Sequence, residues 1–486
     1  MDDLAEARAE LTLLEEQERQ LFERLRNVRT AVQVQRNRID QLLKHVTKPS
    51  INRLPITVLY QIIHLADDEY GLLDGAPLRA KRRLASVSRR WRDVILTSPG
   101  FWTTIAICPS WSPSLMRVYV KRSRECPLNI QIRWWLSRDQ LPKFFELLGL
   151  VISCGYRWRS LIIQNNNKDV EQGIIKSVWN VMFPSLKHVS IYVTQKLDYP
   201  PFLHSRNAHA LEYLDLGNNI GLDNFSVAAS LKSLRLRCSP LTAPLPSIMS
   251  LRMLTMTGSS CGALPLDSIH LPLLESLTVM LEDPQSFLAA IVAPNLGYFA
   301  YSPLQLTTRW SGIFTDLSDK FPNVQHLCLR HPRSSLNGAD IGDAAAVCAT
   351  FPGVHHIEVN VPAFQAFCLA EQEGGTLSIA DRWTHLEHLS LEMVDHNHPG
   401  IRFVEWLRAR RLEGRPALQV TLSKFDAARL PNGRWLISLY NSLHEYCLLE
   451  LKNVPLMFNL TVRTSDPTSL HDVYGILRPW VSLDGQ

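Results

Sequence analysis

Apolar side chains recur at alternating intervals of three and four positions along the first 46 residues, where Leu4 to Val46 contain no glycine or proline. The seam consists of Leu4, Ala7, Leu11, Leu14, Leu21, Leu25, Val28, Val32, Ile39, Leu42 and Val46, interrupted by Glu18 and Gln35. A repeat of 3.5 residues is typical of a left-handed coiled coil. Residues 1–48 are therefore predicted to form a helix of about 65 Å that pairs with another helix, with a homodimer through residues 4–46 as one candidate. The alternative is a single amphipathic helix folded back on the rest of the chain.

Between residues 51 and 105 the apolar positions form short helical stripes instead. The first follows Leu54-Pro55, and a proline is well tolerated in a first helical turn. The second runs through "LASVSRRWRDVIL", and the Thr-Ser-Pro-Gly at 97–100 ends that helix. Phe101 and Trp102 can then fold back on the apolar face. The pattern predicts a compact all-helical unit over 51–105, which is so small that it gains stability from docking on another surface.

The order of these residues resembles the F-box family: a leading Leu-Pro, a first apolar helix, the "LASVSRRW" core and a closing Phe-Trp. Residues 106–155, with an amphipathic helix and a strand, resemble the continuation found in fungal F-box proteins as far as about residue 132. Two departures are the long link at 67–80 and Ser88, where cysteine is frequent. The resemblance implies docking to an acidic Skp1-like adaptor and, through it, to a cullin. The contact residues that it implies are Leu54, Pro55, Leu59, Ile62, Leu84, Val87, Trp91 and Trp102.

Beyond residue 155 the chain carries a degenerate repeat. Three phrases align, "FPSLKHVSI" at 183, "FPNVQHLCL" at 321 and "FPGVHHIEV" at 351, and a looser L-x-x-L-x-L recurs around them. Units of roughly 20 to 32 residues resemble leucine-rich repeats, which stack into a curved solenoid. The expected fold is thus an α+β or α/β solenoid: a coiled-coil helix, a small all-helical F-box, and an irregular leucine-rich-repeat-like solenoid over 156–429 closed by a cap at 430–486.

Within each repeat the residues between the apolar anchors are predicted to point away from the core, because side chains alternate along a strand. They would line the concave face of the solenoid, where such proteins usually bind partners. The resemblance therefore implies a target protein held by this face. The residues proposed to bind it are Tyr213, Asp215, Arg235, Tyr298, His326, His356, Glu358 and His388.

The charge of the chain restricts the classes of partner that the sequence favours. The net charge of +5 is mild for 486 residues, so it does not itself indicate nucleic acid. The run from Arg79 to Arg92, with seven basic residues and no acid, has three interpretations: a solvated helix face, a face opposed to an acidic partner, or a nucleic-acid contact.

The nine cysteines form no C-x-x-C pair. This spacing, an acidic N-terminus without a secretion signal and the lack of a long apolar stretch predict a cytoplasmic or nuclear protein without a membrane anchor.

Signatures of catalysis are missing from the sequence. It contains no G-x-S-x-G, no phosphate-binding loop, no H-E-x-x-H and no G-x-G-x-x-G. The scattered histidines do not have the spacing of metal ligands, so no metal and no cofactor are expected. The predicted function is recruitment of substrates to a ubiquitin ligase of the SCF type, without catalytic residues of its own. The alternatives are an F-box scaffold that joins no ligase and, more weakly, nucleic-acid binding through the basic run.

Overall fold

The computed structural model forms two compact units, Met1–Phe101 and Trp102–Gln486. The residues that it describes are 2–45, 54–73, 77–133, 135, 138–164, 168–193, 200–217, 220, 229–238, 248–260, 262–303, 309–330, 341–369, 378–392, 401–423 and 442–452. The boundary between the units divides the Phe101-Trp102 pair, whose two side chains are both buried.

The first unit is helical. Its helices are α1 (Asp2–His45), α2 (Ile56–Leu73), α3 (Pro77–Val87) and α4 (Arg89–Thr97), followed by a 3-10 turn at Pro99–Trp102. Ser88 caps α4, because its side chain accepts a hydrogen bond from the Trp91 amide at 3.1 Å. The helices α2 to α4 pack on one another around a small core of Leu59, Ile63, Trp91, Val94, Ile95 and Phe101.

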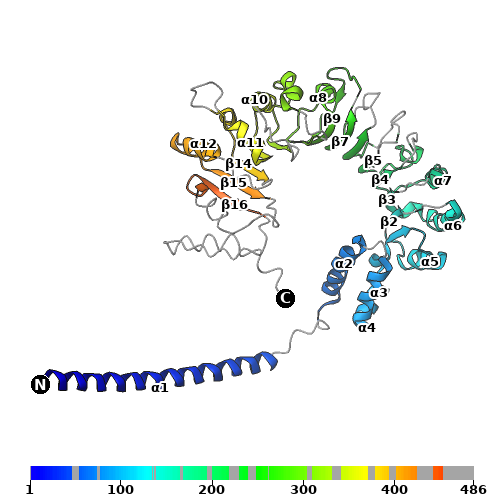
Figure 1. The fold of residues 1–486 in the computed structure, drawn as a ribbon. Helices are drawn as coiled ribbons and strands as arrows, with labels where there is room; N and C mark the ends of the chain where they lie inside the picture. The colour runs from blue at the N-terminus through cyan, green and yellow to red at the C-terminus, as the bar shows by residue number, and fades with distance from the viewer. Residues whose placement is uncertain are drawn as a thin grey trace. The chain divides into compact units, whose positions relative to one another are not determined.

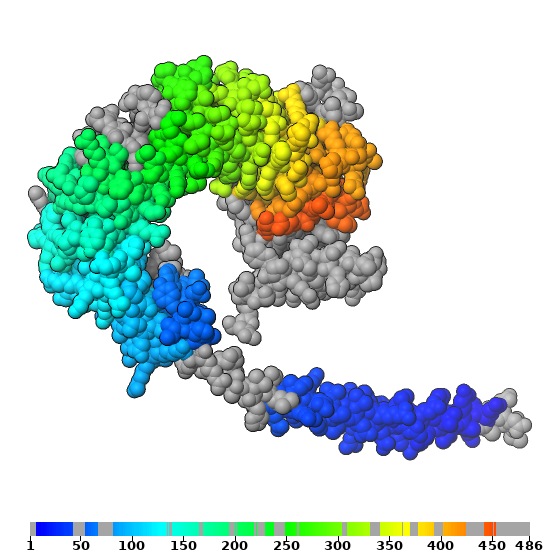
Figure 2. Space-filling model, turned by 180° about the vertical axis from the view of Figure 1, so that it is seen from behind, coloured from blue at the N-terminus to red at the C-terminus, as the bar shows by residue number. Residues whose placement is uncertain are grey.

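In its described residues, the second unit is built on one parallel sheet of 14 strands in the order of the sequence (Figure 1). Successive units of chain are also neighbours in space, as the ordered colours of this unit in Figure 2 show. The strands of the sheet are β1 (Thr104–Ile107), β2 (Leu128–Arg133), β3 (Trp158–Gln164), β4 (His188–Tyr192), β5 (Tyr213–Leu216), β6 (Ser233–Cys238), β7 (Met253–Ser260), β9 (Ser276–Asp283), β11 (Tyr298–Tyr301), β12 (His326–Leu329), β13 (His356–Asn360), β14 (His388–Glu392), β15 (Leu418–Ser423) and β16 (Cys447–Leu451). Two further strands, β8 (Ile269–His270) and β10 (Ile291–Val292), pair separately.

Helices connect many of these strands. They lie on the outer side of the curved sheet (Figure 1). The helices are α5 (Pro113–Arg122), α6 (Leu141–Ile152), α7 (Lys168–Val178), α8 (Gln285–Ala290), α9 (Trp310–Phe314), α10 (Ile341–Thr350), α11 (Val361–Phe367) and α12 (Ile401–Leu412). Short 3-10 turns occur at Arg138–Gln140, Gly155–Arg157, Pro201–Leu203, Thr315–Leu317 and Ile379–Arg382.

The core of the second unit lies between the sheet and these helices. The phenylalanines of the three Phe-Pro phrases, Phe183, Phe321 and Phe351, are buried in it. The rings of Phe321 and Phe351 are stacked with centroids 5.7 Å apart. The last two copies of the phrase therefore join successive units of the chain by a stacked pair of rings, whereas Phe183 stacks on Trp158 at 4.9 Å.

The fold class expected from the sequence, a small all-helical F-box followed by a leucine-rich-repeat-like solenoid, is wrong. The structure is an α/β arrangement with a large parallel sheet, and its first strand begins at Thr104, inside the segment expected to be all-helical. Residues 106–155, expected to connect two domains, contribute β2 to the same sheet in register with β1. A four-residue strand is too short to be recognised by its own alternation, and only pairing with β2 reveals it.

Two other expectations concern the C-terminal cap and a membrane anchor. Of the cap predicted at 430–486, only 442–452 are described, and these residues include β16. No helix in the described part of the chain has both the length and the apolar character needed to cross a membrane.

Candidate functional site

The inner face of the sheet, opposite the helices, presents ordered rows of side chains. Because neighbouring strands are parallel and in register, equivalent positions lie beside each other: His326 is paired with His356, and His356 with His388. The first row consists of His188, Tyr213, Ser233, Met253, Ser276, Tyr298, His326, His356, His388 and Gln419. The second row, two residues further along each strand, consists of Ser190, Asp215, Arg235, Thr255, Thr278, Ala300, Cys328, Glu358, Ser390 and Thr421.

The eight residues predicted to bind a target all lie in these two rows, but they form two groups. Tyr213, Asp215 and Arg235 belong to β5 and β6, whereas the other five belong to strands β11 to β14. The strands β7 and β9 lie between the groups. At about 4.8 Å per strand, the spacing from β6 to β11 is roughly 14 Å. The structure thus offers two polar clusters on one face.

The first cluster is centred on the carboxylate of Asp215, whose residue is only 3% exposed. Its Oδ2 accepts a short hydrogen bond from the Tyr192 hydroxyl and lies 3.5 Å from the Tyr213 hydroxyl, which also donates to it. An Arg235 guanidinium nitrogen lies 3.9 Å from the same oxygen. The other oxygen, Oδ1, is buried and has no hydrogen-bond partner among the described residues. A buried carboxylate is thus held by two phenols and one partly exposed cation.

Two members of this cluster, Tyr192 and Arg237, are not among the residues predicted from the sequence. The Arg237 guanidinium lies over the Tyr192 ring, 4.6 Å from its centroid, in cation–π geometry. Both side chains lie one further step of two residues along their strands. The alternation that identifies the first two rows continues to this third position, and it is the signal that could have found them.

The phenols of the Asp215 cluster are held in their protonated form. Burial, followed by the hydrogen bond to Asp215, raises the pKa of Tyr192 to about 12. Burial and the charge of Asp215 also raise the pKa of Tyr213. Both hydroxyls are therefore donors at neutral pH and not bases, so the arrangement suits binding of a polar group and not proton transfer.

The second cluster is a ladder of aromatic rings in the first row. The Tyr298 ring meets the His326 ring edge-on at 4.9 Å between centroids, and the His326 ring is stacked on that of His356 at 4.1 Å. The His356 and His388 centroids are 5.7 Å apart. Nε2 of His356 is 2.9 Å from the Ser390 hydroxyl, whereas Nε2 of His326 is buried with no hydrogen-bond partner among the described residues.

The histidines at the centre of the ladder are neutral at physiological pH. Burial, reinforced by the neighbouring His326, His388 and Lys452, lowers the pKa of His356 to about 4. Burial also lowers the pKa of His326. A neutral stack can pack against a partner's side chains without the cost of desolvating charges. The centre of the ladder, His326 and His356, is therefore uncharged.

The inner face also carries a thiol, that of Cys328 on β12. Burial, followed by the nearby Glu358, raises the pKa of the Cys328 thiol to about 11, so that the unreactive protonated form dominates. The part of the chain that the structure describes contains no group of three or more histidine, cysteine, aspartate or glutamate side chains placed to hold a metal ion. Stacked rings on neighbouring strands face one another and do not converge on a shared point.

The residues that the F-box resemblance assigned to the adaptor contact differ widely in exposure. Leu59, Trp91 and Trp102 are buried. Leu54 and Leu84 are half-buried, whereas Pro55, Ile62 and Val87 are exposed. Trp102 lies beyond the boundary of the first unit, where its ring meets the Tyr119 ring edge-on at 4.9 Å and the Arg122 guanidinium lies 4.5 Å above it.

An exposed apolar surface does occur on α2. Val58, Ile62 and Leu65, named here the α2 stripe, lie on one side of the helix at intervals of four and three residues and are all exposed. Leu59 and Ile63 on the adjacent side are completely buried. The apolar surface of α2 is thus wider than the part of it that packs into the core of the first unit. The apolar stripe that the sequence predicts after Leu54-Pro55 contains both sides of α2, and periodicity alone does not separate the buried side from the exposed one.

The basic run is largely exposed around α3 and α4. Arg82, Arg83, Arg89 and Arg92 are exposed, whereas Lys81 is buried. Arg90 donates a hydrogen bond to the Leu54 carbonyl, which ties α4 to the residues before α2. One arginine of the run therefore has a structural role, and four exposed ones remain to interact with a partner.

Comparison with known proteins adds no relative: no family model matches the chain, and no curated protein matches it.

Proposed function

We propose that this protein is a substrate-recruiting subunit of an SCF-type ubiquitin ligase. The helices α2 to α4, which lie in the F-box-like segment 51–105, would dock a Skp1-like adaptor and, through it, a cullin. The inner face of the parallel sheet would hold a target protein. Such an assembly acts in the cytoplasm or the nucleus, and either location is part of the proposal.

The observation that carries the proposal is the α2 stripe, because it lies within the segment whose residues resemble an F-box. Val58, Ile62 and Leu65 are exposed although they are strongly apolar. Contiguous exposed apolar surface beside polar residues is typical of a binding site. Val87 at the end of α3 and Leu96 on α4 are exposed as well.

The charge of the same unit supports an acidic partner. Arg82, Arg83, Arg89 and Arg92 are exposed on the helices that pack against α2. Basic residues around an apolar contact accelerate association with an acidic protein and restrict the choice of partner. A face opposed to an acidic partner is therefore the interpretation of the basic run that the proposal adopts.

The chemistry of the inner face supports recruitment and not catalysis. Its phenols and its thiol are protonated at neutral pH, and the histidines at the centre of its ladder are neutral. The protein would contribute by holding the target close to a ubiquitin-charged enzyme, since proximity itself supplies a large part of a rate enhancement.

The test is reconstitution of the purified chain with a Skp1-like adaptor and a cullin, followed by size-exclusion chromatography. The proposal expects a ternary complex, and expects Ile62→Glu to weaken adaptor binding at least about tenfold by placing a charge in an apolar contact. The matched control is Gln61→Glu, which adds the same carboxylate to the neighbouring exposed position. Binding of the adaptor without the cullin would instead favour a scaffold outside the ligase, and equal effects of the two variants would overturn the proposed docking surface.

A further inference from the structure

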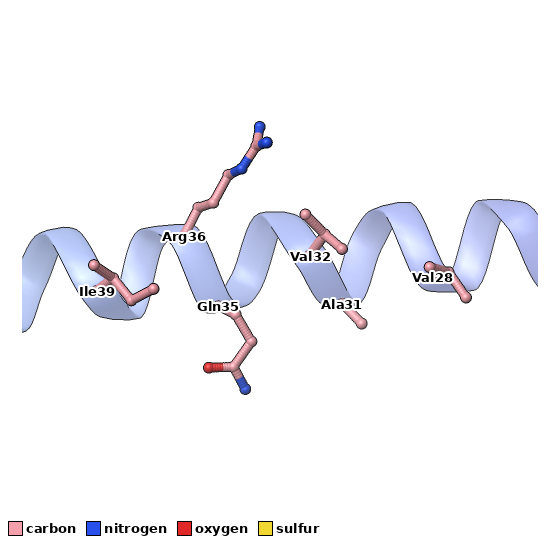
Figure 3. Close-up of a pocket in the computed structure, with 6 residues that line it drawn as sticks. All are labelled: Val28, Ala31, Val32, Gln35, Arg36 and Ile39. Atoms are coloured by element: carbon pink, nitrogen blue, oxygen red, sulfur yellow. The ribbon is translucent and has the colours of Figure 1, made fainter. Parts of the chain in front are cut away.

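The helix α1 has an apolar seam that is open to solvent. Its described seam residues from position 11 onward, Leu11, Leu14, Leu21, Leu25, Val28, Val32 and Ile39, are between 45% and 63% exposed. Figure 3 shows part of this seam, a shallow hollow lined by Val28, Ala31, Val32, Gln35, Arg36 and Ile39. These residues are consecutive seam positions and the positions that flank them. An isolated helix with such a seam is stabilised by a partner helix.

The charge of α1 is divided between its two ends. Residues 2–23 contain eight acidic and two basic side chains, whereas residues 24–45 contain six basic and one acidic side chain. The N-terminal half is thus strongly negative and the C-terminal half strongly positive. Two copies of such a helix attract each other when they are antiparallel and repel each other, half against half, when they are parallel.

The positions beside the seam lead to the same orientation. In a parallel in-register pair each residue that precedes the seam faces the residue five positions later in the partner. This places Glu10 against Glu15 and Arg24 against Arg29, and both pairs are like-charged. A parallel pair would also bury two Glu18 carboxylates in one layer, which is costly.

In an antiparallel pair the seam residues of the two helices face each other along the whole length of the coil. Layers form between positions whose numbers add up to 46, so that Leu14 meets Val32, Leu21 meets Leu25 and Glu18 meets Val28. The flanking positions then place Glu10 near Arg38 and Glu15 near Arg29. Like charges remain where Arg8 approaches Arg36 and where Arg24 approaches its own copy. The antiparallel arrangement nevertheless gives Glu10 and Glu15 a basic partner each, whereas the parallel arrangement sets these two glutamates against each other.

We infer that α1 binds a second copy of this chain as an antiparallel coiled coil. The two chains continue beyond residue 45 at opposite ends of a coil of about 65 Å, so each dimer presents two separated copies of everything that follows. A target with two binding sites would then be held with higher avidity than by one copy. The dimer itself does not depend on the proposed ligase function.

Charge reversal distinguishes the orientations in the full-length chain, with sedimentation equilibrium as the measurement. The first variant, Glu10→Lys with Glu15→Lys, and the second, Arg29→Glu with Arg38→Glu, each turn attractive antiparallel pairs into repulsive ones. Each is expected to raise the dimer dissociation constant at least about tenfold, and the four substitutions together are expected to restore it to near the original value. Salt is expected to weaken the original dimer, because it screens these pairs.

The control variant carries Glu16→Lys with Glu23→Lys, which change the net charge equally but lie on the side of α1 away from the seam. It is expected to weaken the dimer much less than the first variant, and circular dichroism checks that all variants keep their helix. A parallel dimer predicts that Arg29→Glu strengthens association by pairing with Arg24 and that Glu10→Lys with Glu15→Lys changes little. That pattern, a monomeric original chain at tens of micromolar, or a larger assembly would overturn the inference.

Discussion

The imidazole rings of His326 and His356 are stacked with their centroids 4.1 Å apart and their planes 15° from parallel. The two residues are separated by a whole helical connection, and their pairing in register on β12 and β13 brings them together. Two protonated imidazoles at this separation would repel each other strongly. Protonation of both rings would therefore destabilise the stack.

The stability of the sheet is expected to fall between about pH 6.5 and 4. The folded-state pKa of His356 is lowered to about 4 from 6.5, so the unfolded chain binds more protons in this window and unfolding becomes easier as the pH falls. Allowing for partial exposure, the loss is on the order of 1–2 kcal/mol. Urea unfolding at pH 7 and pH 4.5 measures it.

The control for this pH dependence is His356→Gln, which removes the titrating ring but keeps a polar side chain. The difference between the two pH values should become smaller in the variant. An unchanged difference would assign the effect to other groups.

Trp102→Ala is expected to destabilise the second unit by about 3–5 kcal/mol. The ring is 4% exposed and packs edge-on against Tyr119, so its removal leaves a large cavity at the start of the sheet. Thermal unfolding of the variant is the measurement. Trp179→Ala is the matched control, because Trp179 is 43% exposed, and a similar loss in both variants would contradict the assignment of Trp102 to the core.

Ile62 and Ile63 are expected to respond differently to truncation although they are neighbours. Ile63 is completely buried and Ile62 is 37% exposed. Ile63→Ala should lower the free energy of unfolding of the first unit by about 2–4 kcal/mol, and Ile62→Ala by less than about 1 kcal/mol. Chemical denaturation measures both, and the reverse order would show that the wrong side of α2 faces the core.

Gly353 is expected to tolerate no side chain. A Cβ atom at this position would clash with the Pro322 carbonyl oxygen, which belongs to the backbone of the previous Phe-Pro phrase. Gly353→Ala should therefore destabilise the second unit by about 2 kcal/mol or more.

Gly149 on α6 provides the contrast to Gly353, because a Cβ atom there meets nothing within 4 Å. Gly149→Ala should stabilise the helix by about 0.5–1 kcal/mol. Differential scanning calorimetry of both variants separates the two cases, and destabilisation by both would point to a general intolerance of substitution.

Several features of the inner face are predictable because they are local. Alternation along a strand is a property of consecutive residues, so it is enough to place Tyr213, His326, His356 and His388 on the side away from the apolar anchors. The same reasoning identifies α1 from its period of 3.5 residues. Alternation can also place Tyr192 and Arg237 on this face. It cannot show that they lie beside Asp215, because that depends on the register of three different strands.

The amino-acid sequence by itself determined the periodicity of each segment, since helical and extended backbones impose different spacings on consecutive side chains. Only the tertiary structure decided which of these segments share a sheet and which apolar side chains remain exposed, as Ile62 does beside the buried Ile63. It joined Thr104–Ile107 to the parallel sheet and moved Trp102 out of the helical unit. These outcomes depend on pairing and packing between residues far apart in the chain, which no local pattern encodes.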